Sequence, residues 1–151
     1  MTICGTRLTL FAAFLLLLPY VGATWADNAS LAVETANGGK HVFTVELATT
    51  REQQATGLMF RRDLAPGHGM LFVYPGTSPV AMWMKNTFIP LDMLFIDTQG
   101  RITHIVERTV PESTELIGSK GPVKAVLEVR GGTASRLGIK VGDRVRHPVF
   151  P

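Results

Sequence analysis

The feature that most restricts the fold is the regular interruption of the chain by turn-forming residues. Clusters of Gly, Pro and Asn recur about every 8–12 residues between short apolar stretches, as at "NGGK" (37–40), "LAPGHG" (64–69) and "PGTSP" (75–79). No stretch keeps a helical periodicity long enough for a crossover helix, which disfavours a parallel α/β sheet. The pattern predicts one mainly β domain, an antiparallel sandwich or barrel of seven or eight short strands.

Two short helices are expected to decorate these strands. Thr50 and Gln53 have the spacing of a capping box, and the polar stretch that follows them ends at Gly57. A second helix is expected over 133–137, with Gly138 as its stop signal. The expected strands cover residues 31–35, 41–47, 70–74, 80–85, 91–97, 101–110, 122–130 and 141–147.

The N-terminal segment has the pattern of a cleaved secretory signal peptide over residues 1–26. Arg7 precedes an apolar run at 8–18, and small residues follow up to two candidate cleavage points, after Ala23 or Ala26. The run is too short to cross a bilayer as a helix, so no stable membrane anchor is expected after cleavage. The pattern predicts a periplasmic or secreted protein, with residues 27–151 as its single domain.

Charge and cysteine content restrict the partners. The only cysteine, Cys4, lies inside the expected signal peptide, so the core has to hold the exported domain without disulfides. The formal net charge is +3, but Lys and Arg are scattered among the acidic residues and form no basic run. A nucleic-acid partner is therefore not expected. The sequence does not identify a protein partner.

One stretch, "WMKNTFIPLDMLFID" (83–97), places polar residues among strongly apolar neighbours. Strands at 80–85 and 91–97 would be apolar on both faces, which is typical of central strands. A five-residue link would place Lys85 and Asp92 as cross-strand neighbours. A buried Asp92 would need a partner or several hydrogen-bond donors, because an isolated buried charge costs several kcal/mol.

The same stretch offers an aromatic face, a cation, an amide and a carboxylate in Trp83, Lys85, Asn86 and Asp92. Small polar ligands are commonly bound by such mixtures. The alternative is that Asn86 and the Lys85–Asp92 pair only stabilise a tight connection. Both interpretations stay open at the level of sequence.

Three longer stretches give the chain a family resemblance. They are "GLMFRRDLAPGHGMLFVY" (57–74), "MWMKNTFIPLDMLFID" (82–97) and "PVKAVLEVRGGTASRLGIKVGD" (122–143). Together they resemble the DUF192 (UPF0127) family of small, often exported proteins, over residues 31–145. The resemblance implies a compact β domain of sandwich or jelly-roll type and no particular reaction. It also draws attention to Arg61, which lies in the first stretch and could bind an anionic or hydroxylated ligand.

The leading functional hypothesis is an exported domain that binds a small polar or anionic ligand, a saccharide among the candidates. The candidate ligand-binding residues are Arg61, Trp83, Lys85, Asn86 and Asp92. One alternative is an enzyme with Lys85 and Asp92 as an acid–base pair, although no residue is identified as catalytic and the balance favours a non-enzyme. Another is an accessory protein without a ligand.

Metal, cofactor and hydrolase chemistry are less well supported. Five methionines between Met59 and Met93 could offer thioethers to Cu(I), but most lie in apolar runs typical of a core. The four histidines lack metal-ligand spacing, so neither a metal nor a cofactor is expected. A carboxylate pair for glycoside chemistry could come from four acids, Asp92, Asp97, Glu107 and Glu128, although acids of this kind are more readily interpreted as exposed residues at strand ends.

Overall fold

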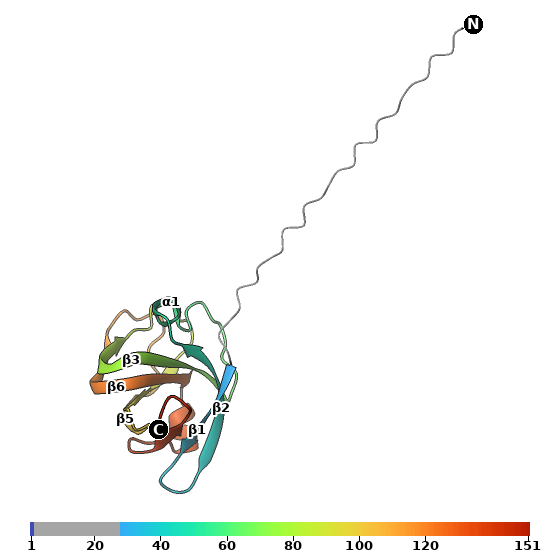
Figure 1. Ribbon diagram of the computed structural model, residues 1–151. Helices are drawn as coiled ribbons and strands as arrows, with labels where there is room; N and C mark the ends of the chain where they lie inside the picture. Colours follow the sequence, from blue (N-terminus) through green and yellow to red (C-terminus); the bar gives the residue numbers. More distant parts are fainter. Residues whose placement is uncertain (2–27) are drawn as a thin grey trace.

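The computed structural model describes Met1 and residues 28–151, so residues 2–26 of the expected signal peptide lie outside the described residues. The described chain forms one seven-stranded sheet and two short helices (Figure 1). The elements are β1 (Asn28–Glu34), β2 (Lys40–Ala48), α1 (Arg51–Thr56), β3 (His68–Met82), β4 (Leu91–Ile96), β5 (Ile102–Val106), β6 (Ile117–Arg130), α2 (Thr133–Leu137) and β7 (Arg144–Arg146).

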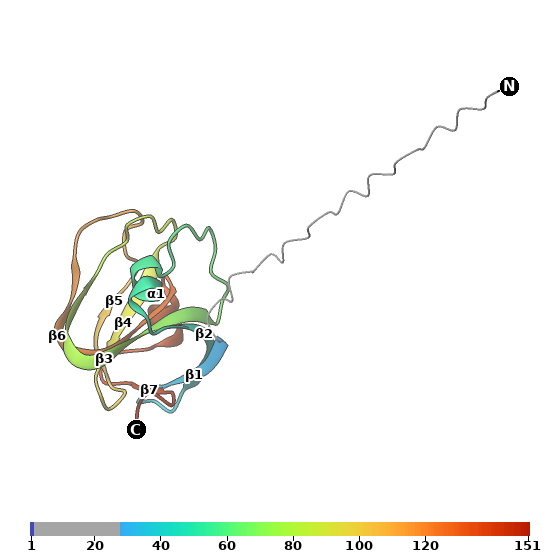
Figure 2. The same cartoon turned by 45° about the horizontal axis from the view of Figure 1, so that its top comes forward.

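The sheet curls until its two edges nearly meet. Its strand order is β5-β4-β6-β3-β2-β1-β7, in which β2 and β3 are parallel and every other pair is antiparallel. Arg101, just before β5, forms a bridge with Arg144 in β7, and the N–H of Val145 donates to the carbonyl of Gly100 at 2.7 Å. The mainly β prediction is confirmed, with a nearly closed barrel as the particular form (Figure 2).

The local predictions for the first elements are confirmed. β1 and β2 form an antiparallel hairpin around the turn that contains "NGGK". The Thr50 hydroxyl accepts from the N–H of Gln53, and the Gln53 side chain accepts from the N–H of Thr50, which is a complete capping box. The second helix ends where expected, because Gly138 adopts the left-handed conformation typical of a helix C-terminus.

The prediction that "PGTSP" separates two strands is wrong. β3 runs without a break from His68 to Met82 and pairs along its length with the long strand β6. Register shifts between Val73 and Ser78 mark a bulged region that absorbs the Gly and Pro residues. Gly and Pro mark bulges as well as turns, and only the partner strand distinguishes the two.

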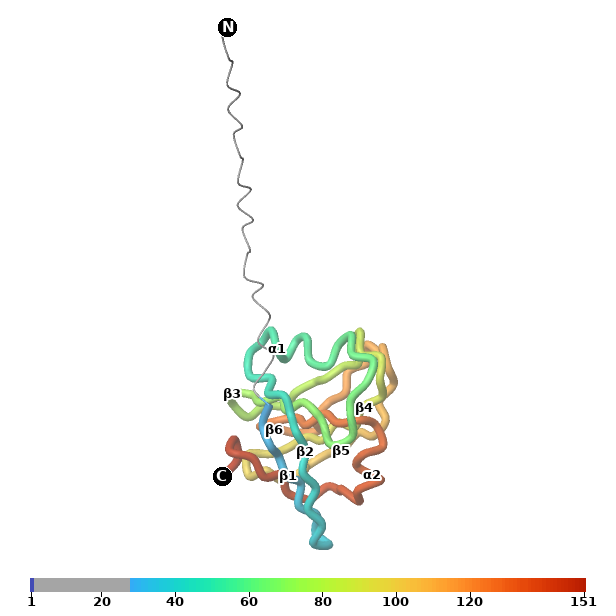
Figure 3. The backbone as a smooth tube through the Cα atoms, turned by 90° about the vertical axis from the view of Figure 1, so that its right-hand side faces the viewer, coloured from blue at the N-terminus to red at the C-terminus, as the bar shows by residue number. Residues whose placement is uncertain are grey.

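Apolar side chains form two clusters on opposite faces of the sheet. One cluster fills the barrel with residues from all seven strands and includes Leu31, Leu71 and Leu127. The other covers the opposite face of β3, β4 and β6 and includes Phe72, Met93 and two residues, Leu58 and Leu64, from the segment after α1. The segments after α1 and after β3 gather at the end of the molecule opposite the β1–β2 turn (Figure 3). Of the residues described, none belongs to a helix long and apolar enough to cross a membrane.

Candidate functional site

The second apolar cluster contains a carboxyl group. Glu128 in β6 lies between Met70 in β3 and Met93 in β4, its register partners, and is only 4% exposed. The interpretation of Glu128 as an exposed strand-end acid is therefore wrong. Because side chains alternate along β6, Glu128 points to the opposite face of the sheet from Leu127, which lies inside the barrel. That outer face is also buried, because the segments after α1 and after β3 cover it.

Glu128 has no charge partner in its surroundings. Among the described residues its side chain makes no hydrogen bond and no ion pair. It opens instead onto a narrow cavity of about 30 Å³, which it lines together with Met59, Met82, Trp83 and Thr87. A cavity of this size holds about one water molecule. Burial raises the pKa of the Glu128 carboxyl to about 8, so this group is mostly protonated at neutral pH.

Tyr74 adds a second polar group to this neighbourhood. Burial of the phenol, followed by the nearby charge of Glu128, raises the pKa of Tyr74 to about 12. The Tyr74 hydroxyl donates to the sulfur of Met82 at 3.4 Å. The hydroxyl therefore remains a hydrogen-bond donor to Met82, which lines the cavity, across the physiological pH range.

Two loops cover the cavity and hold each other in place. The N–H of Phe60 donates to the carbonyl of Asn86 at 2.8 Å, and both residues adopt left-handed backbone conformations, with φ of 64° and 55°. Such a φ is uncommon for a bulky aromatic residue, and backbone strain of this kind clusters at functional sites. Phe60 also packs edge-on against Phe88, with ring centroids 6.3 Å apart.

Three aromatic side chains from these loops face solvent, and we call them the aromatic rim: Phe60, Trp83 and Phe88. They are 63%, 44% and 39% exposed. The ammonium group of Lys85 lies 5.2 Å from the centre of the Trp83 ring, at a distance where a cation–π attraction is expected. The rim is therefore an exposed aromatic surface directly beside the Glu128 cavity.

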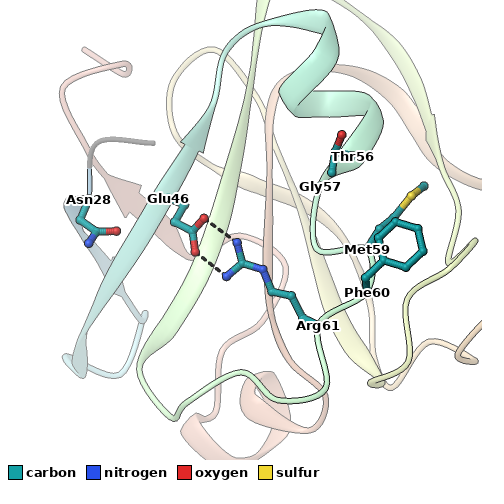
Figure 4. A pocket seen from close by; sticks show the side chains of 7 residues that line it. All are labelled: Asn28, Glu46, Thr56, Gly57, Met59, Phe60 and Arg61. Atoms are coloured by element: carbon teal, nitrogen blue, oxygen red, sulfur yellow. Dashed lines mark hydrogen bonds and ion pairs between the residues drawn. The ribbon is translucent and has the colours of Figure 1, made fainter. Parts of the chain in front are cut away.

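A wider pocket of about 660 Å³ lies on the other side of residues 56–59 (Figure 4). Its wall contains a bidentate ion pair, in which the guanidinium of Arg61 donates to both carboxylate oxygens of Glu46 at 2.5 and 2.6 Å. Asn28 from β1 lies beside this pair, and Phe60 closes the opposite wall. The wider pocket shares Met59 with the narrow cavity, so the two form one region of the surface.

Four of the five predicted ligand-binding residues come together in this region. Arg61 lines the wider pocket, Trp83 lines the narrow cavity, Lys85 lies over Trp83, and the amide of Asn86 contacts the sulfur of Met59 at 3.9 Å. The fifth, Asp92, is buried elsewhere. These four come from two segments that are distant in the sequence, and the fold brings them together.

The predicted pairing of Lys85 with Asp92 is wrong. The strand expected over 80–85 ends at Met82, and β4, which contains Asp92, pairs with β5 and β6 instead of β3. The Asp92 carboxylate accepts three backbone N–H bonds at 2.8 Å, from Arg108, Gly132 and Ala134. The predicted need for several donors is met by the backbone.

Several residues of the region were missed or misjudged from the sequence. Glu46 and Phe60 carried no signal, because an acid in an alternating strand and an aromatic in a polar loop are ordinary features. Glu128 did have a recognisable signal in the sequence, because in "AVLEV" (125–129) a single acid interrupts an apolar run. Such an interruption predicts a buried carboxyl when both faces of the strand are covered.

The methionines divide into two groups. Met70, Met84 and Met93 are buried in the second apolar cluster, as expected of core residues, whereas Met59 and Met82 line the narrow cavity. Within the described part of the chain, no three His, Cys, Asp or Glu side chains are arranged to hold a metal ion.

The fold and the site define a small barrel-like β domain with a buried carboxyl group beneath an aromatic rim. The family model "Uncharacterized ACR, COG1430" (DUF192) matches residues 32–147, and the chain belongs to this family. Three stretches that carry the resemblance, at 57–61, 83–87 and 127–128, meet at the Glu128 cavity.

Two solved structures are similar over most of the chain. One, from Sinorhizobium meliloti 1021, is described as a suspected transcription regulator; it is 47% identical, with a TM-score of 0.83, and the match covers 85% of this chain and all of the other. The second is a protein of unknown function from Novosphingobium aromaticivorans DSM 12444; it is 39% identical, with a TM-score of 0.78, and the match covers 95% and 99% of the two chains. No curated protein matches the chain.

Proposed function

We propose that this protein binds a small, uncharged polyhydroxylated ligand, a saccharide, on the aromatic rim and the two adjoining cavities. One observation carries the proposal: Glu128 is only 4% exposed, its carboxyl group makes no hydrogen bond to another described residue, and the carboxyl oxygens are left accessible from a cavity beside the exposed Trp83. The cavity has room for about one water molecule, so a hydroxyl group of a ligand can occupy it and hydrogen-bond to this carboxyl group. The indole offers an apolar face to a sugar ring.

The charges that line the two cavities favour an uncharged ligand over an anion. Arg61 is neutralised by Glu46, and Glu128 is mostly protonated at neutral pH. At the rim, Lys85 and Arg62 each provide a positive charge, held against the rings of Trp83 and Phe88. Planar polar side chains beside an aromatic face suit the alternating polar and apolar surfaces of a sugar.

The alternative of an enzyme with Lys85 and Asp92 as an acid–base pair gains no support from the geometry, because Asp92 is enclosed by backbone amides away from the rim. We further propose an exported protein, periplasmic or secreted, on the strength of residues 1–26. We propose no nucleic-acid partner, because the two helices of the described chain have six and five residues and are too short to serve as recognition helices. The description as a transcription regulator belongs to the Sinorhizobium relative, and we do not extend it to this chain.

The test is a thermal-shift and calorimetric screen of the purified protein against neutral saccharides, with anions and metal ions as separate sets. A true ligand at 100 times its Kd adds about 2.7 kcal/mol of stability. Trp83→Ala should weaken binding at least about tenfold through lost stacking. Lys85→Ala should abolish binding and leave the melting temperature almost unchanged, because the side chain is exposed.

Leu116→Ala is the matched control, because Leu116 is also an exposed apolar residue and lies outside both cavities. The proposal fails if no saccharide shifts the melting temperature, or if Trp83→Ala binds as well as the control. A loss of several kcal/mol of stability in Lys85→Ala would instead indicate a structural role for the loop.

A further inference from the structure

A third pocket, separate from the narrow cavity and the wider pocket, is lined by three arginines. Arg108 comes from the connection after β5, Arg130 from the end of β6 and Arg136 from α2. Together with Thr133 and Ser135 they surround a space of about 430 Å³, which we call the arginine pocket. None of its lining residues takes part in the site proposed for saccharides.

The buried carboxylate of Asp92 holds this pocket together. One oxygen accepts the N–H groups of Arg108 and Gly132, and the other accepts that of Ala134, all at 2.8 Å. Asp92 thereby fixes the turn that carries Arg108 to the turn that begins α2. Asp92 lies next to Leu91, the register partner of Arg130 in β6, so all three arginines are tied to one point of the sheet.

Close packing keeps Arg108 beside α2. A Cβ atom on Gly132 would lie only 2.9 Å from a guanidinium nitrogen of Arg108, so the absence of a side chain at this position makes room for the guanidinium. The same guanidinium lies 3.4 Å from the Ser135 hydroxyl, and Arg136 donates to the Thr133 hydroxyl at 3.3 Å. Neutral oxygens therefore orient two of the three cations.

The positive charge of the pocket is poorly compensated within the described chain. Among the described residues, the one carboxylate that pairs with any of the three guanidinium groups is that of Asp63, 3.9 Å from Arg130, and its side chain is 76% exposed. An ion pair at such exposure contributes little. The Asp92 carboxylate lies against the backbone of the pocket and accepts backbone N–H groups only. Three guanidinium groups around one pocket repel one another, and an anion between them removes the repulsion.

We propose that the arginine pocket binds a phosphate group, either as the free ion or as a monoester. Guanidinium groups match the tetrahedral oxygens of phosphate with paired N–H donors, and hydroxyl groups such as that of Ser135 add further donors. Asp92 is a positioning residue of this site, because it acts through the backbone of Arg108 and Gly132. The pocket is wide enough to admit part of the organic group of a monoester.

The test is calorimetric titration of the purified protein with inorganic phosphate and, separately, with glycerol 2-phosphate, at constant ionic strength maintained with chloride. Arg108→Gln and Arg136→Gln should each weaken phosphate binding about tenfold, because each removes a charge-assisted pair of donors. Arg51→Gln is the matched control: it loses the same charge from an exposed arginine outside the pocket. Melting temperatures show that each variant is folded.

Tighter binding of the monoester than of the free ion identifies a phosphorylated small molecule as the ligand class, and equal binding identifies the free ion. The proposal is overturned if neither compound binds at millimolar concentration. It is also overturned if Arg51→Gln weakens binding as much as the pocket variants, because the effect is then one of net charge. Loss of the saccharide response in the earlier screen has no bearing on this outcome, since the two sites share no residue.

Discussion

At the scale of single residues, two buried carboxyl groups on neighbouring strands meet the cost of burial in opposite ways. Asp92 and Glu128 lie one register position apart on β4 and β6, on opposite faces of the sheet. Asp92 is surrounded by three backbone N–H groups, which is the environment that a buried carboxylate requires. Glu128 has no such donors, and its carboxyl group holds a proton instead.

The protonation of Glu128 predicts a pH-dependent stability. Its pKa is about 8 in the folded protein and 4.5 in the unfolded chain, so the folded state binds more protons between these values. The contribution of Glu128 to the free energy of unfolding should therefore be largest below pH 4.5 and should fall as pH rises to 8, by on the order of 4 kcal/mol. Glu128→Gln should remove most of this fall, as measured by urea denaturation between pH 4 and 9.

The matched control for that experiment is Glu107→Gln, in which an exposed acid is neutralised. It should keep the pH dependence of the natural protein. Identical curves for Glu128→Gln and the natural protein would show that the Glu128 carboxyl has the same pKa in the folded and the unfolded protein, and would contradict the prediction.

At the scale of elements, β4 is the strand that organises both candidate sites. All six of its residues are buried, and its two neighbours, β5 and β6, hold it in the middle of one side of the barrel. Through Asp92 it fixes the turn after β5 and the start of α2, and through Met93 it forms part of the floor beneath the rim. A change in β4 therefore reaches several elements at once.

Asp92→Asn tests this connecting role. The asparagine keeps the shape but turns an N–H₂ group towards a backbone N–H, so at least one of the three bonds is lost and a buried donor is left unpaired. We expect a loss of about 3 kcal/mol in the free energy of unfolding. Urea denaturation measures it, and hydrogen exchange should show faster exchange at the N–H groups of Gly132 and Ala134.

Asp97→Asn provides the comparison for that variant. Asp97 also accepts two backbone N–H bonds, from Gln99 and Arg101, but in an exposed turn where water can replace them. Asp97→Asn should therefore lower the free energy of unfolding by less than about 1 kcal/mol. Equal losses in the two variants would show that the burial of Asp92 does not matter to its role.

At the scale of the whole molecule, stability depends on the contact that brings the two edges of the sheet together. β7 is the last strand of the sheet, and it lies against the turn before β5, the strand at the other edge. Gly100 makes this approach possible: its φ is 78°, and a Cβ atom there would lie 2.6 Å from the carbonyl oxygen of Val145.

Gly100→Ala should therefore weaken the closure of the barrel. We expect the free energy of unfolding to fall by about 3 kcal/mol. One part comes from placing an alanine in a left-handed backbone conformation, and the other from the displacement of Val145 by the new Cβ atom. Gly38→Ala separates the two causes, because Gly38 has a φ of 87° with no atom near the Cβ position, and it should lose only about 1 kcal/mol. Similar losses in both variants would mean that the two edges can separate at no cost.

The sequence determined the local structure of this protein, because local structure depends on neighbouring residues. Turn residues and alternating apolar positions predicted the β1–β2 hairpin, and the Thr50–Gln53 pair predicted the start of α1. The long motifs also predicted the family correctly. Each of these signals is complete within a few residues or within one continuous stretch.

Only the tertiary structure decided which strands pair and which faces are covered. The sequence placed Asp92 beside Lys85 because the two are close in the chain, whereas the sheet placed Asp92 among the backbone amides of residues 108, 132 and 134. Two loops that are distant from β6 in the sequence cover the face of β6 that carries Glu128. Glu128 is therefore buried, although the local sequence was interpreted as that of an exposed acid. Strand pairing and burial depend on contacts between residues far apart in the chain, and no local pattern encodes them.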